Sequence, residues 1–297
     1  MELRKSNRSL ARIRLALQGP SGSGKTLSAL KIAYGITNDW TRIAIIDTEN
    51  KSADLYSHLG PYSVLNLQAP YTPERYIEAI EKCESAGMDV IIIDSLSHEW
   101  EGEGGILDVH SKMIGNSFTN WSKLTPRHNA LLHRMLASGK HIIATVRSKQ
   151  EYVISDKNGK SAPEKVGMKG IQREGFDYEF TTLFEIDINH NATCTKDRSQ
   201  LFKSKSTFML DEQIGKTIAN WCKEVEGFSD KEILALIRSC KTLDELNYLY
   251  KHKPYTRGQV SEYNHRAAVI KGEVEEYKEI TGKQNENKHK QEHEQLG

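Results

Sequence analysis

The chain has 297 residues, of which 37% are hydrophobic and 27% charged, so it can bury the core of one large domain and a smaller one. Its 41 basic and 40 acidic side chains leave a net charge of +1, so a surface for nucleic acid would have to be a local patch. Its four cysteines lie far apart without a CxxC pair, which argues against a zinc site and a disulfide framework and suits a reducing cytosol.

Short apolar strands alternate with helical patterns through most of the chain. Strands are predicted at 13–17, 42–47, 89–94 and 141–147. Helices are predicted to begin at Lys25 and at Pro73, and a third is bracketed by Pro126 and Gly139. This alternation is typical of a mainly parallel sheet with helices on both faces, so the expected fold class is α/β.

The pattern changes after the strand at 141–147. Asn158-Gly159 predicts a tight turn within a long basic loop, and two antiparallel strands at the sheet edge are predicted on either side of His190-Asn191. From Asp211 the chain is helical, with capping-box patterns at Ser229–Glu232 and Thr242–Glu245. We predict a core at 1–210, a helical extension at 211–280 and a disordered tail at 281–297.

A phosphate-binding motif, GPSGSGKT, lies between the first strand and the first helix and matches GxxxxGK[ST]. Its glycines allow backbone amides to curl around phosphates, and the helix N-terminus adds positive potential. Lys25 would reach the β and γ oxygens, and Thr26 would offer a hydroxyl to Mg²⁺. We therefore expect a nucleoside triphosphate, taken as ATP, bound by Gly19, Pro20, Ser21, Gly22, Ser23, Gly24, Lys25 and Thr26.

A second metal anchor is predicted at Asp94, which ends the apolar strand DVIIID in a Walker-B arrangement. Ser95 follows, where many ATPases carry a glutamate, so the catalytic base is expected elsewhere. Glu49, just past the strand RIAIID, would project over the γ-phosphate and hold the attacking water in line. The alternative is that Glu49 or Asp47 caps the next helix.

These residues resemble the core ATPases of the RecA/RadA type, in which an IDxE strand end follows the phosphate loop and a serine follows the Walker-B aspartate. The corresponding segments here are IIDTE and IIIDS. The blocks YTPERYIEAI, IIIDSLSHEWEG, TPRHNAL, HIIATVRSK and NHNATCTKDR are similar to a group of phage and prophage RecA-like ATPases, regarded as minimal recombinases or single-strand annealing proteins. The resemblance covers residues 12–202 and implies a RecA-like P-loop NTPase core with DNA-stimulated hydrolysis of ATP.

The resemblance also implies a homo-oligomer. In RecA-like and hexameric-helicase cores a Lys-x-Arg pair reaches a neighbour's γ-phosphate, and Lys196 and Arg198 match that pattern. Two cations spaced by two on an extended segment point the same way and could neutralise developing phosphoryl charge. The alternative is a solvated basic pair on an edge hairpin. Where the RecA type carries Asn-Gln, this sequence has Ala144-Thr145, so Thr145 is the candidate γ-phosphate contact, with a shorter reach.

The segment 147–173 lies where the resemblance places DNA-contacting loops, and it carries seven basic residues against three acidic ones. The candidate contacts to single-stranded DNA are Arg147, Lys149, Lys157, Lys160, Lys165, Lys169 and Arg173. A solvated charged face is the alternative. The acidic stretch with His98 and Glu99 is expected to be a surface loop and not a metal site.

Two other functions remain open. A P-loop kinase for a small molecule would use 147–173 as a lid, and a nucleotide-gated interaction protein would dock a partner such as a single-strand-binding protein on the helices at 211–280. The start of the chain has no leader pattern, and no apolar run approaches the roughly 18 residues of a membrane span. We therefore expect a cytoplasmic protein without a membrane partner, in the host cytoplasm if phage-encoded.

Overall fold

The computed structural model describes residues 11–157, 160–202, 206–222, 230–251 and 257–272. The tail predicted at 281–297 and the turn at Asn158-Gly159 lie outside the described residues. The chain divides into two compact units, Met1–Glu224 and Val225–Gly297. In the described part of the chain, no helix is long and apolar enough to cross a membrane.

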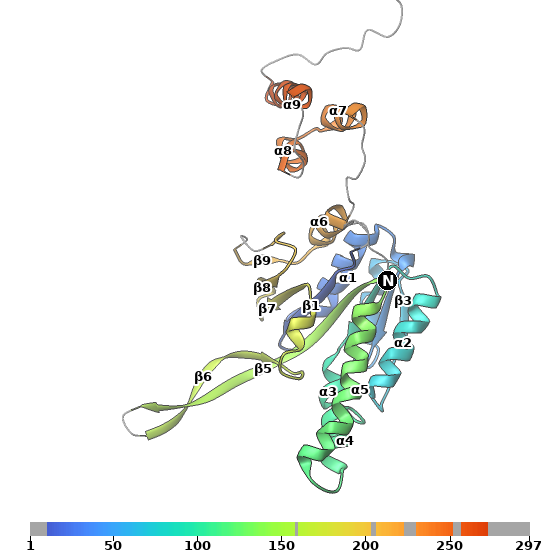
Figure 1. Cartoon of the computed structure of the whole chain (residues 1–297), viewed down its shortest axis with the longest axis vertical. Coiled ribbons are helices and arrows are strands. Elements are labelled where there is room, and N and C mark those ends of the chain that lie inside the picture. Colours follow the sequence, from blue (N-terminus) through green and yellow to red (C-terminus); the bar gives the residue numbers. More distant parts are fainter. Residues whose placement is uncertain (1–10, 158–159, 203–205, 223–229, 252–256, 273–297) are drawn as a thin grey trace, which may run out of the picture. The chain divides into compact units, whose positions relative to one another are not determined.

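The first unit is built on one mainly parallel sheet with the strand order β3-β2-β4-β5-β1-β7-β8-β9, and β6 pairs with β5 (Figure 1). The parallel strands are β1 (Arg14–Gly19), β2 (Ile43–Asp47), β3 (Ser63–Asn66), β4 (Val90–Asp94), β5 (His141–Lys157) and β7 (Thr182–Ile186). The antiparallel additions at one edge are β8 (Asn191–Asp197) and β9 (Phe208–Met209). The predicted α/β fold class and antiparallel edge hairpin are confirmed.

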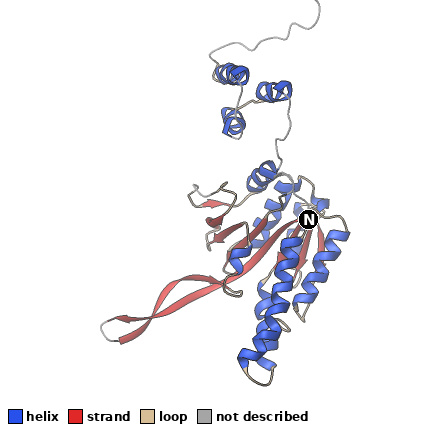
Figure 2. Ribbon diagram, viewed as in Figure 1, coloured by secondary structure: helices blue, strands red, loops and turns tan. Residues whose placement is uncertain are grey.

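Helices cover both faces of this sheet (Figure 2). One face packs against α1 (Lys25–Thr37) and α6 (Glu212–Cys222) in a core that includes Leu15 and Leu17. The other face packs against α2 (Pro73–Ser85) and α5 (Ser117–Ala137) in a core that includes Ala16. Successive residues of a strand point to opposite faces, so the uninterrupted apolar run of β1 serves both cores.

Helix α6, which lies within the predicted extension at 211–280, packs directly on α1. A Cβ added to Gly35 would collide with the backbone of Glu212, and one added to Gly215 would collide with the backbone of Ile32. Only glycine lets the two helices approach this closely. The first compact unit therefore continues past residue 210 and includes α6.

Helix α5 begins at Ser117 and contains Pro126, so the prediction that Pro126 opens this helix was wrong. The Asn116 side chain caps the helix, because its Oδ1 accepts from the backbone N of Phe118 at 2.9 Å. Leu124 and His128 are buried on either side of the proline. The cap and this packing compensate for the loss of the one helical hydrogen bond that proline cannot donate.

The segment 147–173, expected as a loop, contributes most of a long hairpin. Strand β5 continues to Lys157 and pairs antiparallel with β6 (Lys160–Gly170), with a register shift between Glu151 and Tyr152. Figures 1 and 2 show this hairpin extending well beyond the rest of the sheet. The pairing of the runs that flank Asn158-Gly159 is what the turn pattern predicts.

Shorter helices connect these elements. They are α3 (Ser97–Glu101), α4 (Ile106–Lys112) and the 3-10 turns η2 (Trp40–Arg42), η3 (Ser52–Leu59) and η4 (Phe176–Glu179). The surface loop predicted around His98 and Glu99 is wrong, because α3 forms there and Glu99 is fully buried. Its carboxylate accepts hydrogen bonds from His128 at 3.0 Å and Gln172 at 3.2 Å, partners from distant segments that make burial of the charge tolerable.

The second unit consists of α7 (Asp230–Ser239), α8 (Leu243–Lys251) and α9 (Arg257–Ile270), with Ile237, Cys240 and Leu246 in its small core. The capping box at Thr242–Glu245 is confirmed. The Glu245 amide donates to Thr242 Oγ1, and the Thr242 amide donates to Glu245 Oε2, both at 3.2 Å. The box predicted to begin at Ser229 lies outside the described residues.

Candidate nucleotide-binding site

The GPSGSGKT loop leads from β1 directly into α1. Gly22 and Gly24 have φ of 79° and 85°, in the left-handed region that favours glycine. A Cβ on Gly19 would lie 2.5 Å from the carbonyl oxygen of Ile186. The N-cap residue of helix α1 is Gly24, so no side chain caps the start of the helix, and its first turn contains no acidic residue. The positive end of the helix is therefore available to an anion.

A pocket of about 530 Å³ lies over this loop, at the carboxyl ends of the central strands. The phosphate-loop residues that line it are Ser21, Gly22, Gly24, Lys25 and Thr26. The strand ends add Glu49 after β2, Asp94 on β4 and Arg147 on β5. A pocket of this size, at this edge of a parallel sheet, suits a nucleotide.

Asp94 accepts two hydrogen bonds at the floor of the pocket. Thr26 Oγ1 donates to Oδ2 at 2.7 Å, and Thr145 Oγ1 donates to Oδ1 at 2.5 Å. Burial raises the pKa of Asp94, and these two hydrogen bonds oppose that rise. Hydroxyl and carboxylate oxygens are the hard ligands that Mg²⁺ prefers, so Thr26 and Asp94 fit this ion.

Thr145 is fully buried, and it is absent from the residues that line the pocket. Its hydroxyl is committed to Asp94, while its carbonyl accepts from the Leu96 amide at 2.9 Å. The structure therefore places Thr145 behind the carboxylate, as a residue that orients Asp94.

The Lys25 ammonium lies inside the phosphate loop. Its Nζ donates to the carbonyl oxygens of Gly19 at 2.9 Å and Pro20 at 2.7 Å. Burial lowers the pKa of Lys25, an effect that the negative charges of Asp94 and Glu49 oppose. Ser23 is buried beneath the loop, with its amide donating to Pro20 O at 3.3 Å.

Asp47, and not Glu49, caps the segment after β2. Its two carboxylate oxygens accept from the backbone amides of Glu49 at 2.6 Å and Ala53 at 2.9 Å. The Glu49 side chain instead lines the pocket and forms an ion pair with Arg147, whose Nε donates to Oε1 at 2.8 Å. Burial raises the pKa of Glu49, but the hydrogen bonds and charge of Arg147 lower it more, so the net shift is downward.

Arg147 therefore lines the nucleotide pocket, although it was predicted among the contacts to single-stranded DNA. Of that group, Lys149 is exposed and Lys169 and Arg173 line a second hollow at the base of the hairpin. The side chains of Lys157, Lys160 and Lys165 lie outside the described residues.

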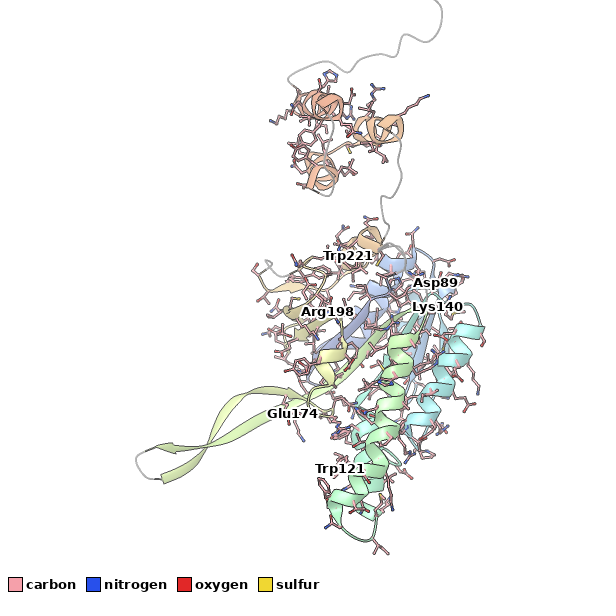
Figure 3. The ribbon with its side chains drawn as sticks, in the orientation of Figure 1. Asp89, Trp121, Lys140, Glu174, Arg198 and Trp221 are labelled. Carbon is pink, nitrogen blue, oxygen red and sulfur yellow. The ribbon has the colours of Figure 1, made fainter. Side chains whose placement is uncertain are left out.

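Lys196 and Arg198 do not reach the pocket of their own chain. Lys196 Nζ donates to the carbonyl oxygens of Asp177 at 2.7 Å and Tyr178 at 2.8 Å, and it lies 5.6 Å from the centre of the Tyr178 ring. Arg198 directly follows β8 and is exposed (Figure 3). Both cations lie away from the phosphate loop.

Several pocket residues were not anticipated from the sequence. Leu55 and Tyr56 come from η3, His190 from the β7–β8 turn, and Met209 from β9. They give the pocket an apolar wall beside its charged floor. They carry no motif, because each comes from a different segment and only the tertiary fold brings it to the phosphate loop.

A comparison with known families supports this site. A family model described as AAA domain matches residues 11–217, a span that contains the sheet, the first part of α6 and every pocket residue named above. No curated protein matches the chain. The family match covers well over half of the sequence, and the chain belongs to the AAA domain family of P-loop ATPases.

Proposed function

We propose that this chain binds ATP with Mg²⁺, hydrolyses it, and acts as a RecA-like protein on single-stranded DNA in phage-type recombination, annealing or replication. The observation that carries the proposal is the meeting of the phosphate loop, Asp94 and Glu49 in one pocket. Each of the three supplies a different requirement of phosphoryl transfer, namely phosphate binding, metal binding and orientation of water.

In this proposal, loop amides and Lys25 hold the β- and γ-phosphates, while Thr26 and Asp94 hold Mg²⁺. The ion, when bound, would neutralise charge on the phosphates. Glu49 orients a water whose oxygen forms a bond to the γ-phosphorus. The bond to the β,γ-bridging oxygen breaks, the electron pair stays with ADP, and one water proton passes to Glu49. The nucleotide base would lie against the apolar wall formed by Leu55, Tyr56 and Met209.

A second copy of the chain is the proposed partner at the pocket rim. Leu55 and Met209, which line the pocket, are 74% and 66% exposed, and Ile188 near Gly22 is 62% exposed. Such an apolar rim favours coverage by protein. The cations Lys196 and Arg198 lie on a different surface of the same unit, which suits a head-to-tail assembly in which they reach the neighbour's γ-phosphate.

The β5–β6 hairpin is the proposed contact for single-stranded DNA. With Arg147 assigned to the pocket, residues 148–173 still carry six basic residues against three acidic ones. A basic hairpin that extends beyond the sheet can follow a phosphate backbone (Figure 2). The helices of the second unit are the proposed docking site for a single-strand-binding protein, and we expect the protein to work in the cytoplasm, that of the host if phage-encoded.

The experiment is an assay of orthophosphate release with Mg²⁺ and ATP, with and without single-stranded DNA, on the wild type and Lys25→Ala. We expect release that rises with DNA and is lost in the variant. ATP bound without turnover, even with DNA, would point to a nucleotide-gated interaction protein. Phosphate transferred to an added small molecule would point to a kinase.

A further inference from the structure

The second hollow, at the base of the β5–β6 hairpin, has a volume of about 330 Å³. Its walls come from the end of β1 at Gln18, the end of β6, the segment 172–177 and the strands β7 and β8. Figure 3 shows Glu174, one of the lining residues, where the hairpin leaves the sheet. Gln18 points to the same face of the sheet as Ala16, which packs toward α2 and α5, whereas the phosphate loop leads into α1 on the other face. The hollow and the nucleotide pocket are therefore separate sites.

Three polar side chains at this hollow have no partner among the described residues. Gln18 is only 6% exposed, yet its amide group makes no hydrogen bond in the described part of the chain. Arg173 and Glu185 likewise form no side-chain hydrogen bond or ion pair within the described ranges. Partial burial raises the pKa of Glu185, as expected for a carboxylate without a cation beside it. A buried amide without a partner costs free energy of folding, so these groups point to a ligand that completes their hydrogen bonds.

The backbone around the hollow holds these side chains together. Gln18 and Glu185 are partners in the parallel register of β1 and β7, so their side chains leave the same face of the sheet next to each other. A Cβ added to Gly170 would collide with Gln18 Oε1, so the glycine at the end of β6 leaves room for the amide. Lys196 ties η4 to β8 at the rim through its hydrogen bonds to two carbonyl oxygens of η4. The hollow is therefore formed before any ligand arrives.

The charges at the hollow suit a nucleobase better than a phosphate. The lining includes three carboxylates and three cations, which are Glu174, Asp177, Glu185, Lys169, Arg173 and Lys196. An anion placed among them would meet as many negative groups as positive ones. A base is neutral, and its edge carries both donors and acceptors, which an amide and a carboxylate can bind. The volume lies at the low end of the range for small-molecule sites, which suits one base and not a stack of several.

We propose that the second hollow receives one unstacked base of single-stranded DNA, with the Gln18 amide and the Glu185 carboxylate bound to the edge of that base. The inference rests on the proposed function and adds a base-binding site to it. The phosphates on either side of the base follow the basic hairpin, with Arg173 as one of their contacts. An ionised carboxylate can only accept hydrogen bonds, and cytosine offers an N4 amino group where thymine has the O4 acceptor. The site should therefore prefer oligo(dC) to oligo(dT).

The test measures the affinities of labelled oligo(dC) and oligo(dT), each of about 15 nucleotides, by fluorescence anisotropy at one salt concentration. A buffer at about pH 8 keeps carboxylates ionised. The wild type should bind oligo(dC) at least about 3-fold more tightly than oligo(dT). Glu185→Gln should bring the two affinities within about 1.5-fold, because an amide can donate to thymine as well as accept from cytosine. Gln18→Leu, which removes the amide and keeps its size, should weaken oligo(dC) by about 5-fold.

Two further variants separate base contacts from other effects. Arg173→Gln should weaken both oligonucleotides by a similar factor and keep the preference, because a phosphate carries no information about the base. Gln213→Leu makes the same substitution as Gln18→Leu at an exposed position of α6, on the other face of the sheet, and should bind like the wild type. Circular dichroism and thermal unfolding of all variants separate misfolding from loss of a ligand contact.

Equal affinities of the wild type for oligo(dC) and oligo(dT), or a preference that Glu185→Gln leaves unchanged, would overturn the inference. If the wild type binds single-stranded DNA while Gln18→Leu behaves like Gln213→Leu, the inference alone fails. If the wild type binds neither oligonucleotide, the proposed action on single-stranded DNA fails and the inference falls with it.

Discussion

Thr145 donates a 2.5 Å hydrogen bond to Oδ1 of Asp94, on the oxygen opposite to the one that Thr26 contacts. The fully buried threonine and the carboxylate come from neighbouring strands, β5 and β4, which are paired in parallel. Because Asp94 accepts from both sides, its carboxylate plane is fixed, and one oxygen is directed toward the Thr26 hydroxyl. The arrangement resembles the hydrogen-bonded supports that orient metal-binding side chains in other proteins.

Thr145→Val should therefore raise the Mg²⁺ concentration required for half-maximal hydrolysis by about 10-fold to 100-fold, the usual cost of removing such a support. The substitution keeps the shape of the side chain but removes the donor. Titration of hydrolysis with Mg²⁺ checks this, with Thr145→Ser as the control that retains the hydroxyl. An unchanged Mg²⁺ requirement in Thr145→Val would show that Thr145 does not support a metal ligand.

Arg198→Ala should leave nucleotide affinity near the wild-type value and slow turnover by at least about 100-fold, because the arginine is proposed to act on a neighbour's phosphate. Mixing this variant with Glu49→Gln should restore part of the activity. Some interfaces between subunits would then combine the intact pocket of one subunit with the intact Arg198 of its neighbour. Hydrolysis measured across mixing ratios checks this. If no ratio exceeds the sum of the two variants, the proposed role between subunits is wrong.

Gly215→Ala should destabilise the first unit by about 1–3 kcal/mol or more, because the added methyl collides with the backbone of Ile32 and Gly35 where α6 crosses α1. Denaturant unfolding of the full chain, followed by a probe in the first unit, measures the effect. Gly139→Ala is the control, because a Cβ there meets nothing within 4 Å. Equal stabilities of the two variants would mean that the helices do not pack as described.

His141 should make the first unit less stable in mild acid. Burial, together with the charges of Arg12 and Arg14, lowers the pKa of this histidine from 6.5 to about 4. Its Nδ1 accepts from the Ile13 amide at 3.1 Å, which requires the unprotonated nitrogen. The unfolded chain therefore binds a proton that the folded chain excludes between these two pKa values, and stability falls as the pH drops through this range.

The expected loss from this one histidine is about 2 kcal/mol between about pH 7.5 and about pH 5. His141→Asn keeps an acceptor for the Ile13 amide but does not titrate. The unfolding free energy of this variant should therefore fall less than that of the wild type as the pH drops over the same range. Unfolding curves of both proteins at the two pH values give the difference. Parallel pH profiles would indicate that His141 is not held neutral in the folded chain.

The elements that could be predicted from the sequence are those whose signals are local. The phosphate loop, the strand ending in Asp94 and the turn at His190 are each encoded within a few neighbouring residues, and each is observed. The short strands β3 and β9 were missed because their residues are only partly buried or exposed, so no apolar run marks them. Pro126 misled the helix prediction because the Asn116 cap and the packing further along outweigh its local effect.

The polar pairs of the site could not be predicted, because they join residues far apart in the chain. Glu49 and Arg147 are 98 positions apart, and Glu99 and His128 are 29 positions apart. Composition suggested that the acidic segment around Glu99 and the basic segment after Arg147 were exposed loops. A charge pattern cannot tell a solvated side chain from one whose partner arrives from another strand or helix, since only the fold supplies that partner.

Glu49 is proposed to activate the attacking water at this pocket. The most direct test of this role is orthophosphate release from bound ATP in a single turnover, with Mg²⁺ and single-stranded DNA, by the wild type and Glu49→Gln. We expect the variant to bind ATP at least as tightly as the wild type but to release phosphate at least about 100-fold more slowly. Phosphate release at the wild-type rate by a variant that binds ATP normally would contradict this role.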